Sequence, residues 1–308
     1  MLKYIVKRLL MLIPVVLGVT FFIFVILSFA PGDPAQLILG TEATPEMIME
    51  KREELGLNDN LLVRYGKYIW DILHGDFGES WYNGYNVLEE FASRLPNTLR
   101  LGLMAMAISS IIGIAMGVVT AVKQYSGLDY MTLALAMLFS SLPAFWFGLM
   151  AQIYFALQLG WLPATGADSW RHFILPACTL AAAQLAGQVR LTRSSMLDVI
   201  KQDYVRTARS KGCTEKRVIL HHVMRNGMLP VVTGLGMSFA GLISGAIVTE
   251  TVFSIPGVAS LMINAVKIRD VPVVMGILFV VAIFIGCVNL LVDLLYGVID
   301  PRVKYGGR

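Results

Sequence analysis

The stretch 203-DYVRTARSKGCTEKRVILHHVMRNGMLP-230 is a polar island between two long apolar segments. Its lysines and arginines are Arg206, Arg209, Lys211, Lys216, Arg217 and Arg225. A basic cluster beside membrane spans marks the cytoplasmic side of the membrane. Gly212 interrupts a helical run, and Thr214 can cap a second short helix. Such a helix suits docking to a soluble partner, and the alternative is a solvated basic loop that only sets topology.

The composition is that of a membrane protein. Of the 308 residues, 56% are hydrophobic and 15% charged, and the mean hydropathy is +0.67. Soluble domains average about 45–50% apolar and about 25% charged residues, so we predict an all-α polytopic membrane protein. The net charge of +4 gives no support to nucleic-acid binding. The three cysteines are scattered and suggest neither a disulfide framework nor a zinc site.

Six apolar segments have about the length that a helix needs to cross a bilayer, roughly 20 residues. They cover residues 9–30, 98–122, 130–157, 173–189, 229–252 and 272–299. Basic residues before the first segment and in the polar island predict that both termini are cytoplasmic. In the second segment, Gly113-x-x-x-Gly117 permits close helix approach. Pro143 predicts a kink in the third, and residues 253–271 are expected to be an outer loop.

The longest polar section, residues 31–97, is rich in acidic side chains and follows the N-terminal span of residues 1–30. It is therefore expected to be extracytoplasmic. Capping and turn residues predict helices over 44–55 and 61–73. Apolar surface to bury comes from Trp70, Phe77, Trp81 and Tyr82. We therefore expect a small ordered external domain.

Apolar length and charge also divide the remaining residues into a membrane core and a tail. Residues 98–299 are expected to be a five-helix permease core, with a cytoplasmic loop at 197–228, and residues 300–308 a cytoplasmic tail.

The polar island resembles the EAA loop of binding-protein-dependent ABC import permeases, in the dipeptide/oligopeptide/nickel branch. Arg206-Thr207-Ala208 stands where the general pattern has Glu-Ala-Ala, followed by Gly212 and later by Leu229-Pro230. The peptide branch tends to read YVRTARxKG at this point. Further similar segments are PGDP, ELGLNDNLLVRY, HGDFGES, ETVFSIPGVASL and DPRVKYG.

This resemblance implies a type I ABC importer (MetI-like) transmembrane domain of six helices, with an extracytoplasmic insertion between helices 1 and 2. It implies a multi-pass permease of the cytoplasmic membrane that moves di- or oligopeptides, or alternatively nickel, metal chelates or glutathione. The implied partners are a homologous second permease, two ABC ATPase subunits, an extracytoplasmic binding protein and membrane lipid. ATP and magnesium would be bound by the ATPases, with no cofactor in this chain.

The resemblance also assigns roles to residues of the island. Residues 214–220 would be a coupling helix that sits in a groove of an ATPase subunit. The residues implied in coupling are Thr207, Ala208, Gly212, Thr214, Glu215 and Arg217. Gly212 would adopt the left-handed conformation that ends a helix.

Ionisable residues inside spans are costly and are candidates for function. Glu250 is expected near the outer mouth of the pathway, where it either receives a peptide ammonium or plays a structural part. Asp293 and Asn289 share one helix face, and Asp293 is either an interhelix anchor or a substrate contact.

Other function classes find less support in the sequence. There is no Walker A pattern, so this chain should not hydrolyse ATP. Neither a catalytic motif nor a metal motif is present, which disfavours an intramembrane enzyme. The alternative from another class, an ion-coupled secondary transporter, tends to show internal repeats and midplane charges. Inhibition by vanadate or by an uncoupler separates the two transporter classes.

Overall fold

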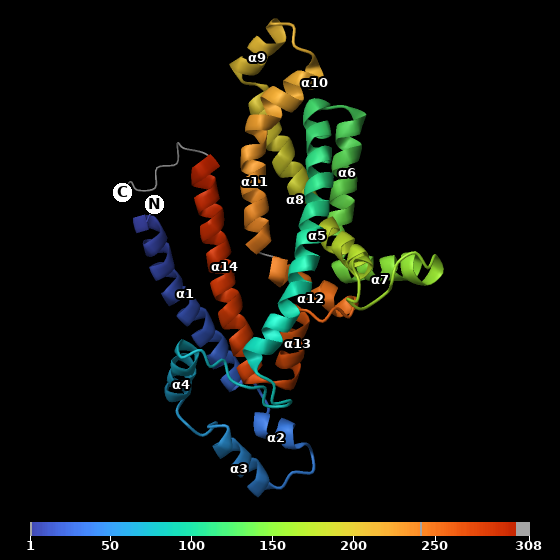
Figure 1. The fold of residues 1–308 in the computed structure, drawn as a ribbon. Helices are drawn as coiled ribbons and strands as arrows, with labels where there is room; N and C mark the ends of the chain where they lie inside the picture. Colours follow the sequence, from blue (N-terminus) through green and yellow to red (C-terminus); the bar gives the residue numbers. More distant parts are fainter. Residues whose placement is uncertain (1, 241, 300–308) are drawn as a thin grey trace. The chain divides into compact units, whose positions relative to one another are not determined.

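The computed structural model describes residues 2–240 and 242–299, and the regular structure of these residues is helical (Figure 1). The predicted tail at 300–308 and Gly241 lie outside the described residues. The chain divides into two compact units, residues 1–96 with 257–287 and residues 97–256 with 288–308. Helices α5 (Val87–Val122) and α14 (Val271–Ile299) contribute residues to both units.

Unit one contains the external section. Besides its parts of α5 and α14, its helices are α1 (Leu2–Phe29), α2 (Pro34–Leu39), α3 (Pro45–Glu54), α4 (Leu61–Leu73) and α13 (Val258–Ile268). The two helices predicted in this section are confirmed as α3 and α4. Thr44 caps α3 by accepting a 3.4 Å hydrogen bond from the Met47 amide. Gly56 follows α3 with a positive φ of 64°, which lets the chain leave the helix. Trp70, expected to be buried, is 65% exposed, and its ring lies 4.5 Å from that of His74 at a tilt of 44°.

Helix α13 lies within residues 253–271, where the sequence predicts an outer loop, so most of this segment is helical. Val258, Leu261 and Ala265 are buried together with residues of α5 and α14. Their spacing of three and four residues is helical. This helical spacing was hard to recognise in the sequence, because the segment is short and is flanked by Pro256-Gly257 and by charged residues.

The corner between α13 and α14 is tied to two distant segments of unit one. Arg269 has a left-handed φ of 59°, and its guanidinium donates to the carbonyls of Ala30 and Gly32. Asp270 is buried and accepts from the Ser80 hydroxyl and the Trp81 amide. The corner therefore fixes both the end of α1 and the 80–81 turn.

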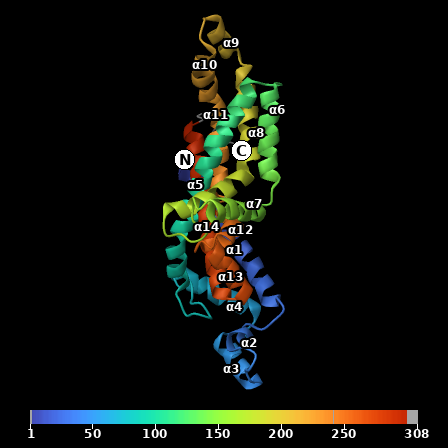
Figure 2. The same cartoon turned by 90° about the vertical axis from the view of Figure 1, so that its right-hand side faces the viewer.

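Unit two contains the polar island and the helices around it. Besides its parts of α5 and α14, it includes α6 (Gly127–Ser141), α7 (Ala144–Ala151), η1 (Gln152–Gln158), η2 (Trp170–Phe173), α8 (Ile174–Ile200), α9 (Asp203–Ser210), α10 (Glu215–Arg217), η3 (Val218–Val223), α11 (Met224–Ala240) and α12 (Leu242–Val252). Figures 1 and 2 both show α9 and α10 at one end of the α8–α11 pair, away from α7 and α12.

The close approach predicted for Gly113 and Gly117 is confirmed. A Cβ at Gly113 would come within 2.5 Å of Gln188, and one at Gly117 within 2.4 Å of Thr192. Gln188 and Thr192 are four residues apart on α8. The two glycines therefore let α5 pack directly on the α8 backbone.

The kink predicted at Pro143 is a sharp bend that separates two helices. Helix α6 ends at Ser141, α7 begins at Ala144, and the two are bent by 95°. Leu142 is extended because the ring of the following proline disfavours helical geometry. The Ser141 hydroxyl donates to the Leu138 carbonyl at the end of α6.

By length and composition, three described helices can cross a membrane, over Tyr4–Phe29, Val87–Val122 and Val271–Leu294. The bent pair over Gly127–Ser141 and Ala144–Gln158 adds a fourth if it is one span. Taken singly, helices α8, α11 and α12 are not both long enough and apolar enough to be counted among these candidate spans. Helix α8 continues past its apolar part through Arg190 and Arg193.

Candidate functional site

Helix α9 is a short separate helix with two different faces. Val205 and Ala208, three residues apart, are buried, whereas Arg206, Thr207 and Arg209 are exposed. The Thr207 hydroxyl donates to the Asp203 carbonyl, within the helix itself. The exposed face is therefore available to a partner while the other face holds the helix in place.

The buried face of α9 belongs to an apolar cluster that joins several elements of unit two. The cluster contains Ala121, Met196, Val205, Ala208, Val218, Ile219 and Val223. These residues come from α5, α8, α9 and η3. Polar contacts add to the cluster, since Asn226 donates to the Tyr204 hydroxyl at 2.7 Å and Ser195 donates to the Gly227 carbonyl at 2.6 Å. A displacement of α9 would therefore be passed to α8 and α11.

Gly212 ends α9 in the predicted left-handed conformation, with φ +78°. Its amide bonds to the Arg209 carbonyl, and the Cys213 amide bonds to the Ala208 carbonyl. Arg209 then spans the turn, with its Nε 2.8 Å from a carboxylate oxygen of Glu215. This hydrogen bond lowers the pKa of Glu215.

The coupling helix expected at residues 214–220 differs from the structure. Helix α10 starts after Thr214, as predicted, but runs on through η3 into α11. Thr214 is the N-cap residue, yet its hydroxyl makes no capping hydrogen bond. Neither proline nor glycine interrupts residues 215–226, so the helix does not stop. The short separate helix of the island is α9.

The basic surface consists of six exposed residues on and after α9. They are Arg206, Arg209, Lys211, Lys216, Arg217 and Arg225. Of the residues predicted for coupling, Thr207, Gly212, Thr214, Glu215 and Arg217 are exposed in the same region, and Ala208 is buried. Four residues that hold this region together were not predicted from the sequence, since polar and small side chains in a polar segment give no signal of their partners: Tyr204, Asn226, Ser195 and Gly227.

Glu250 lies in the interior of unit two. Its side chain is 0% exposed, and one carboxylate oxygen accepts a 2.6 Å hydrogen bond from the Thr98 hydroxyl. The neighbouring Asn97 amide donates to the Pro256 carbonyl. These contacts join the second-unit part of α5 to α12 and the residues after it.

Asn289 and Asp293 are one turn apart on α14, as predicted. Asn289 is exposed and Asp293 is half-buried. Both lie on α14, whereas Glu250 lies on α12 and bonds to Thr98 of α5.

Comparison with known proteins covers the whole chain. Residues 94–305 match the family described as binding-protein-dependent transport system inner membrane component, and residues 1–102 match its N-terminal counterpart. The glutathione transport system permease protein GsiC of Salmonella typhimurium (strain LT2) is 43% identical over 99% of this chain and 100% of its own length. The dipeptide transport system permease protein DppB of Alkalihalophilus pseudofirmus is 42% identical over the same shares.

The solved structures with a similar fold are more distant in sequence. An inward-facing form of the MetNI methionine ABC transporter has a TM-score of 0.60 at 14% identity, covering 69% of this chain and 97% of the other. An amino acid ABC transporter crystallised with histidines has a TM-score of 0.51 at 20% identity, covering 68% and 94%. These similarities indicate a MetI-like, type I importer fold. With the family matches, they show that the chain belongs to the binding-protein-dependent transport system inner membrane components and is a permease subunit of an ABC importer.

Proposed function

We propose that this permease imports di- and oligopeptides across the cytoplasmic membrane. The observation that carries the proposal is identity above 40%, over the full chain, to permeases named for dipeptide and glutathione transport. Both named cargoes are short peptides. Glutathione import is the alternative within the same machinery, and nickel and metal chelates are further ones.

The energy would come from two separate ATPase subunits, and cargo from an extracytoplasmic binding protein. A homologous second permease would complete the pathway. This chain contributes no catalytic residue and no cofactor site in that arrangement, because ATP and magnesium would be bound by the ATPases.

The exposed face of α9 and the basic surface would dock on an ATPase subunit. Arg206 and Thr207 point away from the apolar cluster that holds α9. That cluster joins α9 to α5, α8 and η3, so closure of the ATPase pair would move these helices as levers. The arginines and lysines suit a groove with acidic side chains.

The topology would comprise six spans, with both termini cytoplasmic and residues 31–97 outside. Helix α8 supplies the fourth span, and α11 with α12 the fifth. Such spans can carry polar and small residues where they pack on other helices instead of lipid. Thr179, Gln188 and Thr192 of α8 are buried in this way.

Along the pathway, Glu250 would act as an interhelix anchor, because it is enclosed by the protein and bonded to Thr98. Asn289 and Asp293 would be the better candidates to meet cargo, since Asn289 is exposed.

The test is uptake of radiolabelled dialanine by proteoliposomes containing the complete transporter and its binding protein. We expect ATP-dependent uptake that vanadate abolishes and an uncoupler leaves intact. Arg206→Glu on α9 should lower uptake at least tenfold while the protein still assembles in the membrane. The matched control is Lys123→Glu, which makes the same charge change on an exposed residue outside the island.

Three results would contradict the proposal. Uptake that an uncoupler abolishes and vanadate spares indicates an ion-coupled transporter. Equal loss in Lys123→Glu would mean that net charge, not docking at α9, matters. Uptake of glutathione or nickel without uptake of dialanine would replace the proposed cargo.

A further inference from the structure

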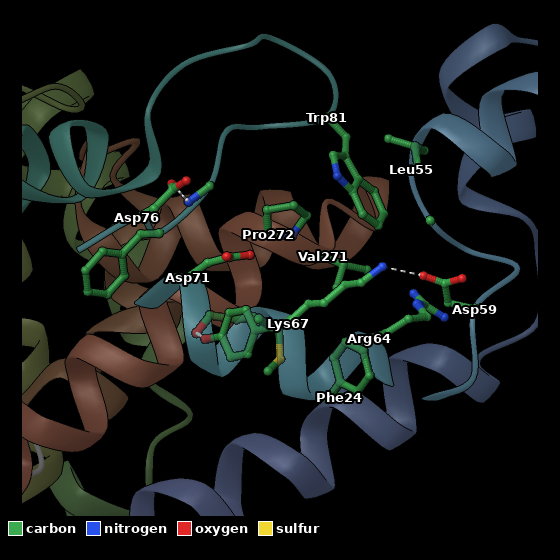
Figure 3. Close-up of a pocket in the computed structure, with 15 residues that line it drawn as sticks. Phe24, Leu55, Asp59, Arg64, Lys67, Asp71, Asp76, Trp81, Val271 and Pro272 are labelled. Carbon is green, nitrogen blue, oxygen red and sulfur yellow. Dashed lines mark hydrogen bonds and ion pairs between the residues drawn. The ribbon is translucent and has the colours of Figure 1, made fainter. Parts of the chain in front are cut away.

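A cavity of about 240 Å³ opens within unit one, well away in sequence from the polar island (Figure 3). It lies between α1, α4, the 76–81 loop and the first residues of α14. Its lining is mixed: aromatic and proline side chains form walls, and charged side chains of both signs project from α4 and the loop. Such convergence of a few polar groups in an apolar-walled cavity is typical of small-molecule sites.

The positive end of the cavity is formed by Arg64 and Lys67. The Arg64 guanidinium lies 5.4 Å from the centre of the Phe24 ring and is half-buried. It makes no hydrogen bond to any described residue. Burial lowers the pKa of Arg64, and the nearby Asp59 carboxylate partly opposes this shift. Lys67 is held beside it by an ion pair of 2.7 Å with Asp59.

The negative end is formed by Asp71 and Asp76. Figure 3 shows both carboxylates on the side of the cavity opposite Arg64 and Asp59. The Asp71 residue is exposed, and its carboxylate makes no hydrogen bond or ion pair with a described residue. Asp76 uses one oxygen to accept from the Gly78 amide at 2.8 Å, which leaves its other oxygen available.

The distance between the two ends follows from the helix. Arg64 and Asp71 are seven residues apart on α4, which corresponds to about 10 Å along the helix axis. A peptide chain spans at most about 3.3–3.6 Å per residue. The termini of an extended tripeptide, at most about 10–11 Å apart, therefore match this separation, and a dipeptide of about 7 Å reaches both ends only through the length of the charged side chains.

The walls are held by contacts that do not involve the charged residues lining the cavity. The Tyr68 hydroxyl donates to the Met275 carbonyl at 2.8 Å. The Trp81 amide donates to the buried Asp270 at 3.1 Å. The Trp81 and Pro272 side chains offer apolar surface for a small side chain. The cavity is thus preformed, and little ordering entropy is lost on binding.

We infer that this cavity binds a short zwitterionic peptide, with the peptide carboxylate at Arg64 and its ammonium between Asp71 and Asp76. The inference rests on the proposed cargo class and adds a binding site for it in the external section of the permease. A lone cation would leave the half-buried Arg64 without an anionic partner, and a lone anion would not use the exposed carboxylates of Asp71 and Asp76. A ligand that carries both charges, separated by up to a tripeptide's length, uses both ends.

The experiment measures binding to the full chain in lipid nanodiscs, without ATP or partner subunits. Dialanine and trialanine are titrated while the tryptophan fluorescence of the chain is followed, and equilibrium dialysis with radiolabelled dialanine provides a second measure. We expect saturable binding that acetylation of the amine or amidation of the carboxylate weakens. Arg64→Gln and Asp71→Asn should each weaken it about tenfold to hundredfold, as expected for loss of a hydrogen bond to a charged group.

The controls remove the same charges elsewhere in the external section. Lys51→Gln and Glu50→Gln lie on α3, outside the cavity lining, and should leave the affinity unchanged. Trp81→Phe should remove the fluorescence change, and dialysis then reports whether binding persists. No saturable binding, equal binding of the doubly blocked peptide, or equal losses in the α3 controls would overturn the inference. Failure of the complete transporter to take up dialanine would instead refute the proposed cargo. The two failures can be told apart, because the binding assay involves no transport.

Discussion

At the scale of single residues, Gly212 illustrates a position that is constrained by backbone alone. Its φ is +78°, and an added Cβ would meet nothing within 4 Å. A substitution there is therefore resisted by the left-handed conformation and not by packing. That separates its effect on the α9–α10 turn from any effect on the helix core.

We predict that Gly212→Val uncouples transport while leaving the protein in the membrane. A branched residue in this conformation costs about 1–2 kcal/mol, enough to shift the turn that orients α9. Gly212→Asn is the matched variant, because asparagine tolerates left-handed backbone. The measurement is peptide uptake per ATP hydrolysed in proteoliposomes. Normal coupling in Gly212→Val would count against docking through α9.

Glu250, unlike Gly212, is constrained by the side chains packed around it, so its substitutions act through packing and hydrogen bonding. Glu250→Gln keeps an oxygen that can accept from Thr98, so uptake and substrate preference should stay near wild type. Glu250→Leu leaves the buried Thr98 hydroxyl without that acceptor and should lower stability by about 1–3 kcal/mol. Thermal unfolding in nanodiscs measures the stability. A changed substrate preference in a stable Glu250→Gln protein would favour the receiving role over the anchor.

At the scale of elements, the glycines of α5 set how closely it packs on α8. Gly117→Ala would place its Cβ 2.4 Å from Thr192 and 3.0 Å from the Val189 carbonyl. The helices would have to separate, at a cost of about 1–3 kcal/mol for overpacking. Gly187→Ala is the matched control in the middle of α8, where a Cβ meets nothing within 4 Å. A melting temperature lowered only in Gly117→Ala would agree with this; equal melting temperatures would show that the interface adapts.

The α13–α14 corner carries a prediction about pH. Burial raises the pKa of Asp270, although its bonds from Ser80 and Trp81 oppose the rise. Because the folded pKa is raised, the stabilisation is complete below the unfolded value of about 3.9 and is lost as pH rises through the raised value. The protection factor of the Trp81 amide against hydrogen exchange should therefore fall with rising pH.

The control for this prediction is Asp270→Asn. Asparagine keeps an acceptor for the Trp81 amide but does not ionise, so its protection factor should not depend on pH. A pH dependence that persists in Asp270→Asn would assign the effect to another group.

At the scale of the whole molecule, the proposed topology makes residues 31–97 and the polar island face opposite sides of the membrane. In a background without Cys178, Cys213 and Cys287, single cysteines would be introduced as Glu50→Cys or Lys211→Cys. Both positions are exposed. A membrane-impermeant maleimide should label the first in intact spheroplasts and the second only after permeabilisation. Labelling of Lys211→Cys from outside would refute the six-span topology with cytoplasmic termini.

Much of the architecture could be predicted where a signal is local. Thr44, Pro45 and Gly56 delimit α3, and Gly212 ends α9, because caps and left-handed turns depend on neighbouring residues only. The close approach at Gly113 and Gly117 also followed from spacing. The segments that differ from prediction are those whose character depends on packing. Helix α13 and the helix that continues beyond residue 220 both bury apolar residues against distant elements.

Sequence alone determined that this chain is a helical membrane permease with a basic polar island. The length of the apolar segments, the clustering of basic residues and the family motif can all be recognised without a structure. Tertiary structure decided which short helix stands apart, that Glu250 is enclosed, and that Arg64, Asp71 and Trp81 border one cavity. Several of these outcomes depend on contacts between residues far apart in the chain, such as Glu250 with Thr98 and Tyr68 of α4 with Met275 of α14. Burial and hydrogen-bond partners are properties of the folded chain, so only the folded chain could reveal them.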